Sequence, residues 1–233
     1  MTIELHQFRT LPGFPNFSPF CMKVETWLRM AGLDYRVAVE LGPHKGPLGK
    51  LPFVRDGGET IADSHSIIAR LAQKHGRDLD ASLSAEQRAT RHAFDRLLSE
   101  HLYWAMVHAR WVDDAAWPQV RALFFGSLPW PLKSLLPRFA RRGMIAQLKS
   151  HGLGRHPRDE IYARAAQDLQ ALADQLGEQP YFLGAQPTTL DAAAYAFLAN
   201  AYAAPITTAM RPLVAAHPNL VAYCERMRTR YFS

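Results

Sequence analysis

Residues 15–29 decide how the first part of this 233-residue chain folds: Pro-Asn-Phe-Ser-Pro-Phe-Cys-Met-Lys-Val-Glu-Thr-Trp-Leu-Arg. Ser18 is a favoured N-cap residue, and Pro19 stands at the first helical position, where its missing N–H costs nothing. Apolar side chains then recur at helical spacing, and Gly32 ends the pattern; these are Cys21, Val24, Trp27, Leu28 and Ala31. The stretch therefore predicts a helix from residue 19 to residue 31.

Strand-like segments lie on both sides of this helix. We expect strands at residues 3–8, 35–40, 51–55 and 60–62 and a second helix at residues 64–75. The turn Asp56-Gly57-Gly58 joins the last two strands. The order βαβ followed by ββα predicts a small α/β domain over residues 1–77.

The strand signal disappears after the linker Gly76-Arg77-Asp78. Capping boxes at Ser84 with Gln87 and at Thr188 with Asp191 each predict a helix start. Helices are expected at residues 84–112, 160–176, 188–203 and 218–227. Residues 115–154, rich in Pro, Gly and aromatic side chains, give no clear pattern. The second domain, residues 83–233, is therefore predicted to be all-helical.

Composition excludes several classes of protein. With 48% hydrophobic and 21% charged residues, the chain is not expected to be disordered. Its apolar runs are too short to span a bilayer. No secretory leader pattern is present, and two cysteines are too few for a disulfide framework, so we expect a cytoplasmic location. The net charge of +6 comes without a nucleic-acid motif, and the ten histidines come without metal-ligand spacing. We therefore expect neither nucleic acid nor metal as a partner.

The segment Ser18-Pro19-Phe20-Cys21 is the first feature that carries chemistry. It has the spacing of a C-x-x-C redox motif with serine at the first position. A helix start offers free N–H groups and the positive end of the helix dipole. A thiolate held there would be stabilised, and a serine hydroxyl can donate its proton to such a sulfur. Ser18 as a simple helix cap is the alternative.

Two further features fit the same ligand. If the Leu51–Pro52 peptide is cis, the backbone of Leu51 is left open to pair with a peptide-like ligand. At the next helix start, Ser64 can bind a carboxylate while Asp63 faces an ammonium group. Peptide, carboxylate, ammonium and thiolate together describe glutathione.

With these features in order, the chain resembles the glutathione transferase superfamily. Residues 15–29, the run His151-Gly152-Leu153-Gly154-Arg155-His156 and the Thr188–Asp191 capping box are similar to its failed axon connections and metaxin-like branch. The resemblance covers essentially the whole chain. It implies a thioredoxin-like N-terminal domain, an all-α C-terminal domain, glutathione as co-substrate, a small apolar electrophile as second substrate, and a homodimer without stable membrane insertion.

The resemblance also assigns roles to individual residues. Ser18 stands where omega-type transferases keep a nucleophilic cysteine, and Cys21 matches the second, usually buried position of that motif. We therefore take Ser18 and Cys21 as the catalytic candidates. The glutathione-binding candidates are Phe20, Lys50, Leu51, Pro52, Asp63 and Ser64. For Lys50 the alternative is a solvated surface charge, and for Asp63 and Ser64 a plain helix cap.

The helical half is expected to supply the electrophile side. Helical spacing places Trp104, His108 and Trp111 on one face of a long helix, where they can wall an apolar pocket or belong to the domain core. Residues 123–142 mix bulky apolar with basic side chains, as in a lid over the cleft or a membrane-contacting surface.

Three functions stay open from the sequence. The leading hypothesis is a transferase that conjugates the glutathione thiolate to a small electrophile, in the manner of a detoxification enzyme. A non-catalytic, metaxin-like interaction module is the second, and thiol exchange through Cys21 is the third.

Overall fold

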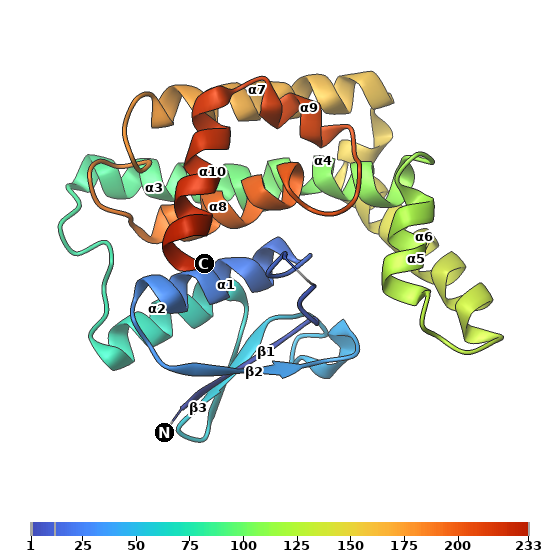
Figure 1. Cartoon of the computed structure of the whole chain (residues 1–233), viewed down its shortest axis with the longest axis horizontal. Helices are drawn as coiled ribbons and strands as arrows, with labels where there is room; N and C mark the ends of the chain where they lie inside the picture. The colour runs from blue at the N-terminus through green and yellow to red at the C-terminus, as the bar shows by residue number, and fades with distance from the viewer. Residues whose placement is uncertain (1, 12, 233) are drawn as a thin grey trace.

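The computed structural model describes residues 2–11 and 13–232 and has two layers (Figure 1). A small sheet with two helices forms the lower layer, and a larger group of helices lies above it. This is the predicted architecture of a thioredoxin-like N-terminal domain followed by an all-α domain. Met1 and Ser233, the outer limits of the two predicted domains, lie outside the described residues. We keep the boundary at residues 78–82 as a proposal.

The sheet has four strands in the order β2-β1-β3-β4. Its strands are β1 (Ile3–Gln7), β2 (Tyr35–Val39), β3 (Phe53–Asp56) and β4 (Glu59–Ala62). β1 pairs in parallel with β2 and antiparallel with β3, and β4 continues the sheet antiparallel to β3. The four predicted strands are therefore present. β2 is an edge strand, and its Val39 is 55% exposed.

Helices α1 (Pro19–Met30) and α2 (Ser64–His75) complete the lower layer. As predicted, Ser18 caps α1, Pro19 is its first residue, and Gly32 follows with a left-handed φ of 62°. α2 ends at Gly76, also left-handed at φ 61°, a conformation that suits glycine. Both helices bury one face against the sheet. The core between them contains Ile3, Leu5, Val24, Trp27, Leu28, Val54, Ile67 and Leu71.

The upper layer is helical throughout. Its helices are α3 (Ala85–Arg96), α4 (Tyr103–Val107), α5 (Trp117–Phe125), α6 (Leu132–His151), α7 (Arg158–Leu176), α8 (Thr189–Tyr202), α9 (Met210–Ala215) and α10 (Pro218–Tyr231). Both predicted capping boxes form. α8 is buried along almost its whole length and packs on α1, so it joins the two layers.

The predicted helix at residues 84–112 contains two irregular turns. π-helical turns at Leu97–Leu102 and His108–Val112 flank the short α4. Each π turn adds a residue to one turn of helix and rotates every side chain that follows. The regular spacing assumed from the sequence therefore does not hold across either π turn.

Residues 115–154, which gave no clear pattern, fold mainly into the helical pair α5 and α6. The pair extends from one end of the molecule, with the connection between the two helices at its edge (Figure 1). Pro137 lies inside α6, where proline usually breaks a helix. Proline-rich sequence hid these helices, because local propensity counts against them and packing between them does not show in the sequence.

Candidate functional site

Ser18 lies at the N-terminus of α1 and is partly exposed. Its Oγ accepts a hydrogen bond from the Cys21 N–H at 3.3 Å, and its own N–H donates to Asn16 Oδ1 at 3.0 Å. The hydroxyl hydrogen of Ser18 is not needed for either bond, although the hydroxyl also lies near the Cys21 thiol and opposes part of the rise that burial causes in its pKa. Within residues 2–11 and 13–232, no hydrogen bond uses the N–H of Phe20. A ligand atom beside Ser18 thus meets a hydroxyl donor, a free amide and the positive end of a helix dipole.

Phe20 and Cys21 face the interior instead. The Phe20 ring packs edge-on against Tyr103 and Phe197, with ring centroids 4.9 and 5.3 Å apart. Only the main-chain N–H of Phe20 is therefore placed for a ligand. Cys21 has no solvent exposure, and burial raises the pKa of its thiol to about 12. At neutral pH the thiol is protonated and inaccessible, which argues against thiol exchange through Cys21.

A buried polar network holds the loop that carries Ser18. Arg110 donates from Nη1 to the Phe17 carbonyl at 2.8 Å and from Nη2 to the carbonyl and Oδ1 of Asn200 at 2.6 and 3.0 Å. Asn200 Nδ2 donates to the Asn16 carbonyl at 3.1 Å, and Asn16 Nδ2 donates to the Phe8 carbonyl at 2.8 Å. The helical layer thus fixes the Ser18 loop through two of its own buried side chains.

The sequence interpretation missed this network. Burial lowers the pKa of Arg110 to about 10, so the guanidinium remains a cation at neutral pH and needs its acceptors. The signal that could have found the network is Asn200, a polar residue in the otherwise apolar run of α8. A buried amide has to pair with something, and here it pairs with the loop.

The segment predicted to pair with the ligand backbone, residues 50–52, lies before β3. The Leu51–Pro52 peptide is cis, as the sequence hypothesis required. The Leu51 side chain packs against Cys21 and Phe53 and is buried. Lys50 is exposed, and its Nζ lies 3.4 Å from Gln147 Oε1 on α6. Lys50 therefore bridges from the lower layer toward the projecting helical pair.

Asp63 and Ser64 begin α2 as predicted. One carboxylate oxygen of Asp63 accepts from the N–H groups of His65 and Ser66, both at 3.0 Å. Asp63 also has a φ of 71°, unfavourable by about 1–3 kcal/mol for a side chain of this kind. Strain of this size at a helix start is typical of a functional position. The second carboxylate oxygen of Asp63 is not used in these two bonds.

The three side chains predicted to line one pocket point to three different helices. Trp104 stacks on His151 of α6 with ring centroids 4.6 Å apart. His108 contacts Tyr162 of α7 at 5.5 Å, and Trp111 contacts Trp117 of α5 at 5.9 Å. The π turn at His108–Val112 rotates Trp111 out of the row that a regular helix would give it with Trp104 and His108. The structure does not bring the three together.

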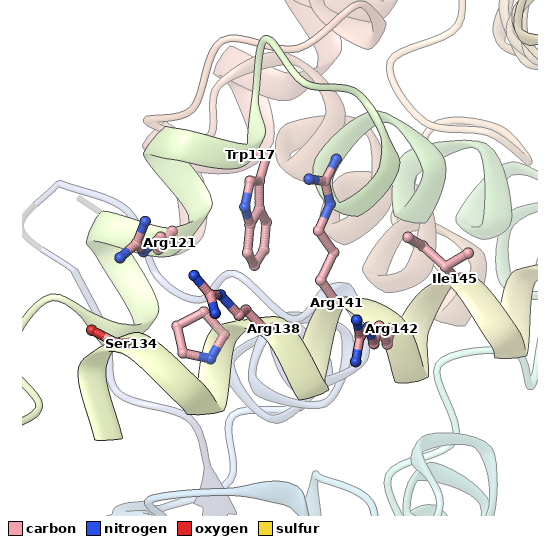
Figure 2. A pocket seen from close by; sticks show the side chains of 8 residues that line it. Trp117, Arg121, Ser134, Arg138, Arg141, Arg142 and Ile145 are labelled. Atoms are coloured by element: carbon pink, nitrogen blue, oxygen red, sulfur yellow. The ribbon is translucent and has the colours of Figure 1, made fainter. Parts of the chain in front are cut away.

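A cavity of about 360 Å³ lies elsewhere, between α5 and α6 (Figure 2). In Figure 2 Trp117 of α5 points toward α6, and Arg141 lies 5.0 Å from the centre of its ring. The lining residues are Trp117, Arg121, Ser134, Pro137, Arg138, Arg141, Arg142 and Ile145. No residue predicted for glutathione binding or catalysis is among them. The part of the chain that the structure describes also has no cluster of side chains suited to a metal ion.

The site therefore combines an N-terminal helix start, a second helix start with a strained cap, and a thioredoxin-like sheet between them. Two sequence profiles of one protein family match this chain. The profile described as the glutathione S-transferase N-terminal domain matches residues 19–116, and that of the glutathione S-transferase C-terminal domain matches residues 165–227. Together they match more than half of the chain. The chain belongs to the glutathione S-transferase family.

Three curated relatives refine this placement. Failed axon connections of Drosophila melanogaster is 36% identical over 195 residues, which are 78% of this chain and 46% of that protein. The isoprene-epoxide–glutathione S-transferase of Rhodococcus sp. (strain AD45) is 34% identical over 94% of each chain. Human metaxin-2 is 29% identical over 91% of this chain and 81% of its own. The predicted resemblance to the failed axon connections and metaxin branch is confirmed, although the chain spans only about half of failed axon connections itself.

Solved structures support the fold. A glutathione S-transferase of Methylobacterium radiotolerans JCM 2831, solved with glutathione sulfonate, superposes with a TM-score of 0.62 at 18% identity. The match covers 99% of this chain and 92% of that one. At this identity the likeness shows the architecture alone.

Proposed function

We propose that this protein binds glutathione along the first domain and conjugates its thiolate to a small, mostly apolar electrophile. The observation that carries the proposal is Ser18, a partly exposed hydroxyl at the start of α1 with a proton to donate. Two comparisons support it: a relative of nearly equal length is named for glutathione transfer to isoprene epoxide, and a fold neighbour was solved with glutathione sulfonate. An epoxide is therefore the first electrophile to test.

In the proposed complex the glutathione sulfur lies beside Ser18. The hydroxyl donates to the sulfur, and the helix dipole and the Phe20 N–H favour its negative charge. Together they lower the thiol pKa, so the thiol loses its proton to solvent before it reacts. The thiolate then forms the new S–C bond while a C–O bond of the epoxide breaks, and the resulting alkoxide takes a proton from water.

The rest of glutathione is proposed to follow the residues named from the sequence. The ammonium group pairs with the unused carboxylate oxygen of Asp63, and the adjacent carboxylate binds Ser64 at the start of α2. The backbone of Leu51 pairs with the cysteinyl part, and Lys50 binds the glycyl carboxylate.

On the electrophile side, we propose Trp104 as a wall of the acceptor site. Ring contacts run from Trp104 to Tyr103 at 5.3 Å and from Tyr103 to Phe20 at 4.9 Å, so Trp104 is connected to the Ser18 loop. Trp104 is partly exposed, as a wall residue must be.

Calorimetric titration with glutathione, followed by turnover with an epoxide, tests the proposal. For Ser18→Ala we expect kcat/KM to fall about 100-fold, because the donor to the developing thiolate is lost, while the glutathione Kd changes little. The matched control is Ser84→Ala, which removes the N-cap of α3 away from the site and is expected to leave both constants unchanged. Equal turnover in Ser18→Ala and the wild type would remove Ser18 from the mechanism.

The second candidate is a non-catalytic, metaxin-like interaction module that has the fold but no turnover. It is favoured by the side chains of Phe20, His108 and Trp111, which pack among aromatic neighbours instead of facing a shared pocket. The similarity to failed axon connections and metaxin-2 points the same way. This candidate predicts no change in Tm in millimolar glutathione and no turnover of glutathione with an epoxide, and glutathione-dependent turnover would contradict it.

We also propose, from the family resemblance, a homodimer in the cytoplasm. Sedimentation equilibrium of the purified chain tests the dimer, and imaging of the tagged chain in its cell tests the location. Among residues 2–11 and 13–232, no helix combines the length and the apolar character needed to cross a bilayer.

A further inference from the structure

The net charge of the chain is concentrated in one segment. Residues 115–154 contain six Lys and Arg and no Asp or Glu, while the whole chain has 27 basic and 21 acidic residues. The rest of the chain is therefore neutral, with 21 of each. In the structure the segment forms α5, α6 and the connection between them at one end of the molecule (Figure 1).

The same element exposes an unusual amount of apolar surface. Trp130, at the tip, is 84% exposed, and Phe139 on α6 is 65% exposed. Between them, Leu132, Leu135 and Leu136 are each at least 43% exposed. The four α6 positions follow the spacing i, i+3, i+4, i+7, so they form one continuous stripe along the helix. We call these five residues the apolar stripe.

The apolar stripe is a second apolar face of α6, separate from the face that packs onto the protein. Pro137 and Leu148 are the buried residues of this helix, and Arg141 turns inward to the carbonyls of Trp111 and Val112 at 2.8 and 2.7 Å. The packing of α6 on its own domain therefore leaves the stripe uncovered.

Basic side chains border the apolar stripe. Arg138 and Arg142 are exposed and follow Leu135 and Phe139 of the stripe by three positions each, so they lie beside it on α6. Together with Arg121 they also line the cavity (Figure 2). None of the eight residues lining that cavity is acidic. An apolar face flanked by Arg and Lys, with an exposed Trp at its end, is the pattern of a helix that lies in a membrane interface.

We infer that the α5–α6 pair docks the protein onto an anionic phospholipid bilayer. The apolar stripe enters the boundary between headgroups and acyl chains, and Arg138, Arg142 and Arg121 bind lipid phosphates. Charge complementarity selects this occupant. A second copy would bring the same acid-free basic surface against itself, and like charges repel across such an interface. The inference concerns a surface apart from the proposed glutathione site and does not depend on it.

The test uses the full chain and sedimentation with vesicles. We expect binding to vesicles of phosphatidylglycerol in phosphatidylcholine, weak binding to pure phosphatidylcholine, and weaker binding in 0.5 M salt because salt screens the charges. Absence of binding to the anionic vesicles, or equal binding to both kinds, overturns the inference.

Matched variants sharpen the test. We expect Arg142→Glu to lower the affinity for anionic vesicles at least about fivefold, since loss of one basic residue near the surface costs about 1 kcal/mol and the new negative charge is repelled as well. Arg77→Glu, also exposed but in the lower layer, should have little effect. Phe139→Ser should weaken binding about fivefold or more, and Leu41→Ser, at a site that is 96% exposed outside the stripe, should not. Equal loss in either matched pair overturns the inference.

Two control measurements separate membrane docking from misfolding and from self-association. The Tm of each variant shows that exposed substitutions leave the fold intact, and turnover at the proposed glutathione site should be unchanged in Arg142→Glu. Sedimentation velocity without vesicles reports self-association. If Phe139→Ser dissociates a dimer and the wild type does not bind vesicles, the apolar stripe is a contact between two copies of the chain, and the inferred docking to a bilayer is wrong.

Discussion

Replacing Asn200 with alanine tests whether the helical layer positions the proposed thiolate site. The substitution removes the Nδ2 donor to the Asn16 carbonyl, which lies in the loop before Ser18. It also removes the Oδ1 acceptor of Arg110, although Arg110 keeps the Asn200 and Phe17 carbonyls. The substitution therefore leaves the buried Asn16 carbonyl without its donor.

The magnitude follows from the bonds lost. An orphaned buried carbonyl costs about 1–3 kcal/mol, and a hydrogen bond to a charged group contributes about 1.5–3 kcal/mol. Alanine recovers about 0.5 kcal/mol through its higher helix propensity. We therefore expect the free energy of unfolding to fall by about 2–5 kcal/mol, and Tm by about 5–15 °C in a chain of this length. A looser Ser18 loop should also raise the glutathione Kd about tenfold.

The assay pairs urea denaturation with calorimetric titration of glutathione well below Tm. The control is Leu172→Ala, a fully buried α7 residue whose truncation costs a similar 2–5 kcal/mol. We expect Leu172→Ala to lose stability and keep the wild-type Kd. Equal changes in Kd for Asn200→Ala and Leu172→Ala would refute the positioning role. An unfolding free energy within 1 kcal/mol of wild type for Asn200→Ala would refute the network itself, whether or not glutathione binds.

Three further predictions concern buried groups. Cys21, with no exposure and a raised pKa, should react with a thiol reagent only after unfolding, and fast reaction of the native protein would contradict its burial. Lys23 of α1 and Asp95 of α3 form a buried ion pair between the layers. Asp95→Ala should lower the free energy of unfolding by about 3–5 kcal/mol, and the double variant Lys23→Met with Asp95→Leu should recover most of this loss. Additive losses in a double-mutant cycle would argue against the pair. Burial opposes ionisation of Asp95, but Lys23 and Arg96 outweigh burial and lower the pKa of the Asp95 carboxyl. The ionised carboxyl therefore stabilises the folded state above the ordinary carboxyl pKa near 3.8, and this stabilisation is lost as pH falls below about 4. Denaturation curves between pH 6 and 2.5 should show this loss in the wild type and a smaller one in Lys23→Met.

The sequence was sufficient for the local elements of the first domain. Ser18 with Pro19 placed the start of α1, glycine placed its end, and apolar alternation placed the strands, because these signals act between residues that are close in the chain. The capping boxes at Ser84 and Thr188 were equally local and equally correct.

The helical half was predicted less well. Proline and aromatic residues hid α5 and α6, whose formation depends on packing between two helices rather than on propensity. The π turn after Val107 changed the direction of Trp111, and nothing in a hydrophobic period reports an extra residue in one turn.

By itself, then, the sequence determined the fold class, the caps of the main helices and the position of Ser18 at a helix start. Only the tertiary structure decided how that helix start is held, since Arg110 and Asn200 lie more than 90 residues beyond the loop they bind. The burial of Cys21 was likewise decided by packing. The physical reason is range: caps and periods are set by neighbours in the chain, whereas hydrogen-bond partners of buried polar groups and the pKa of a thiol are set by neighbours in space.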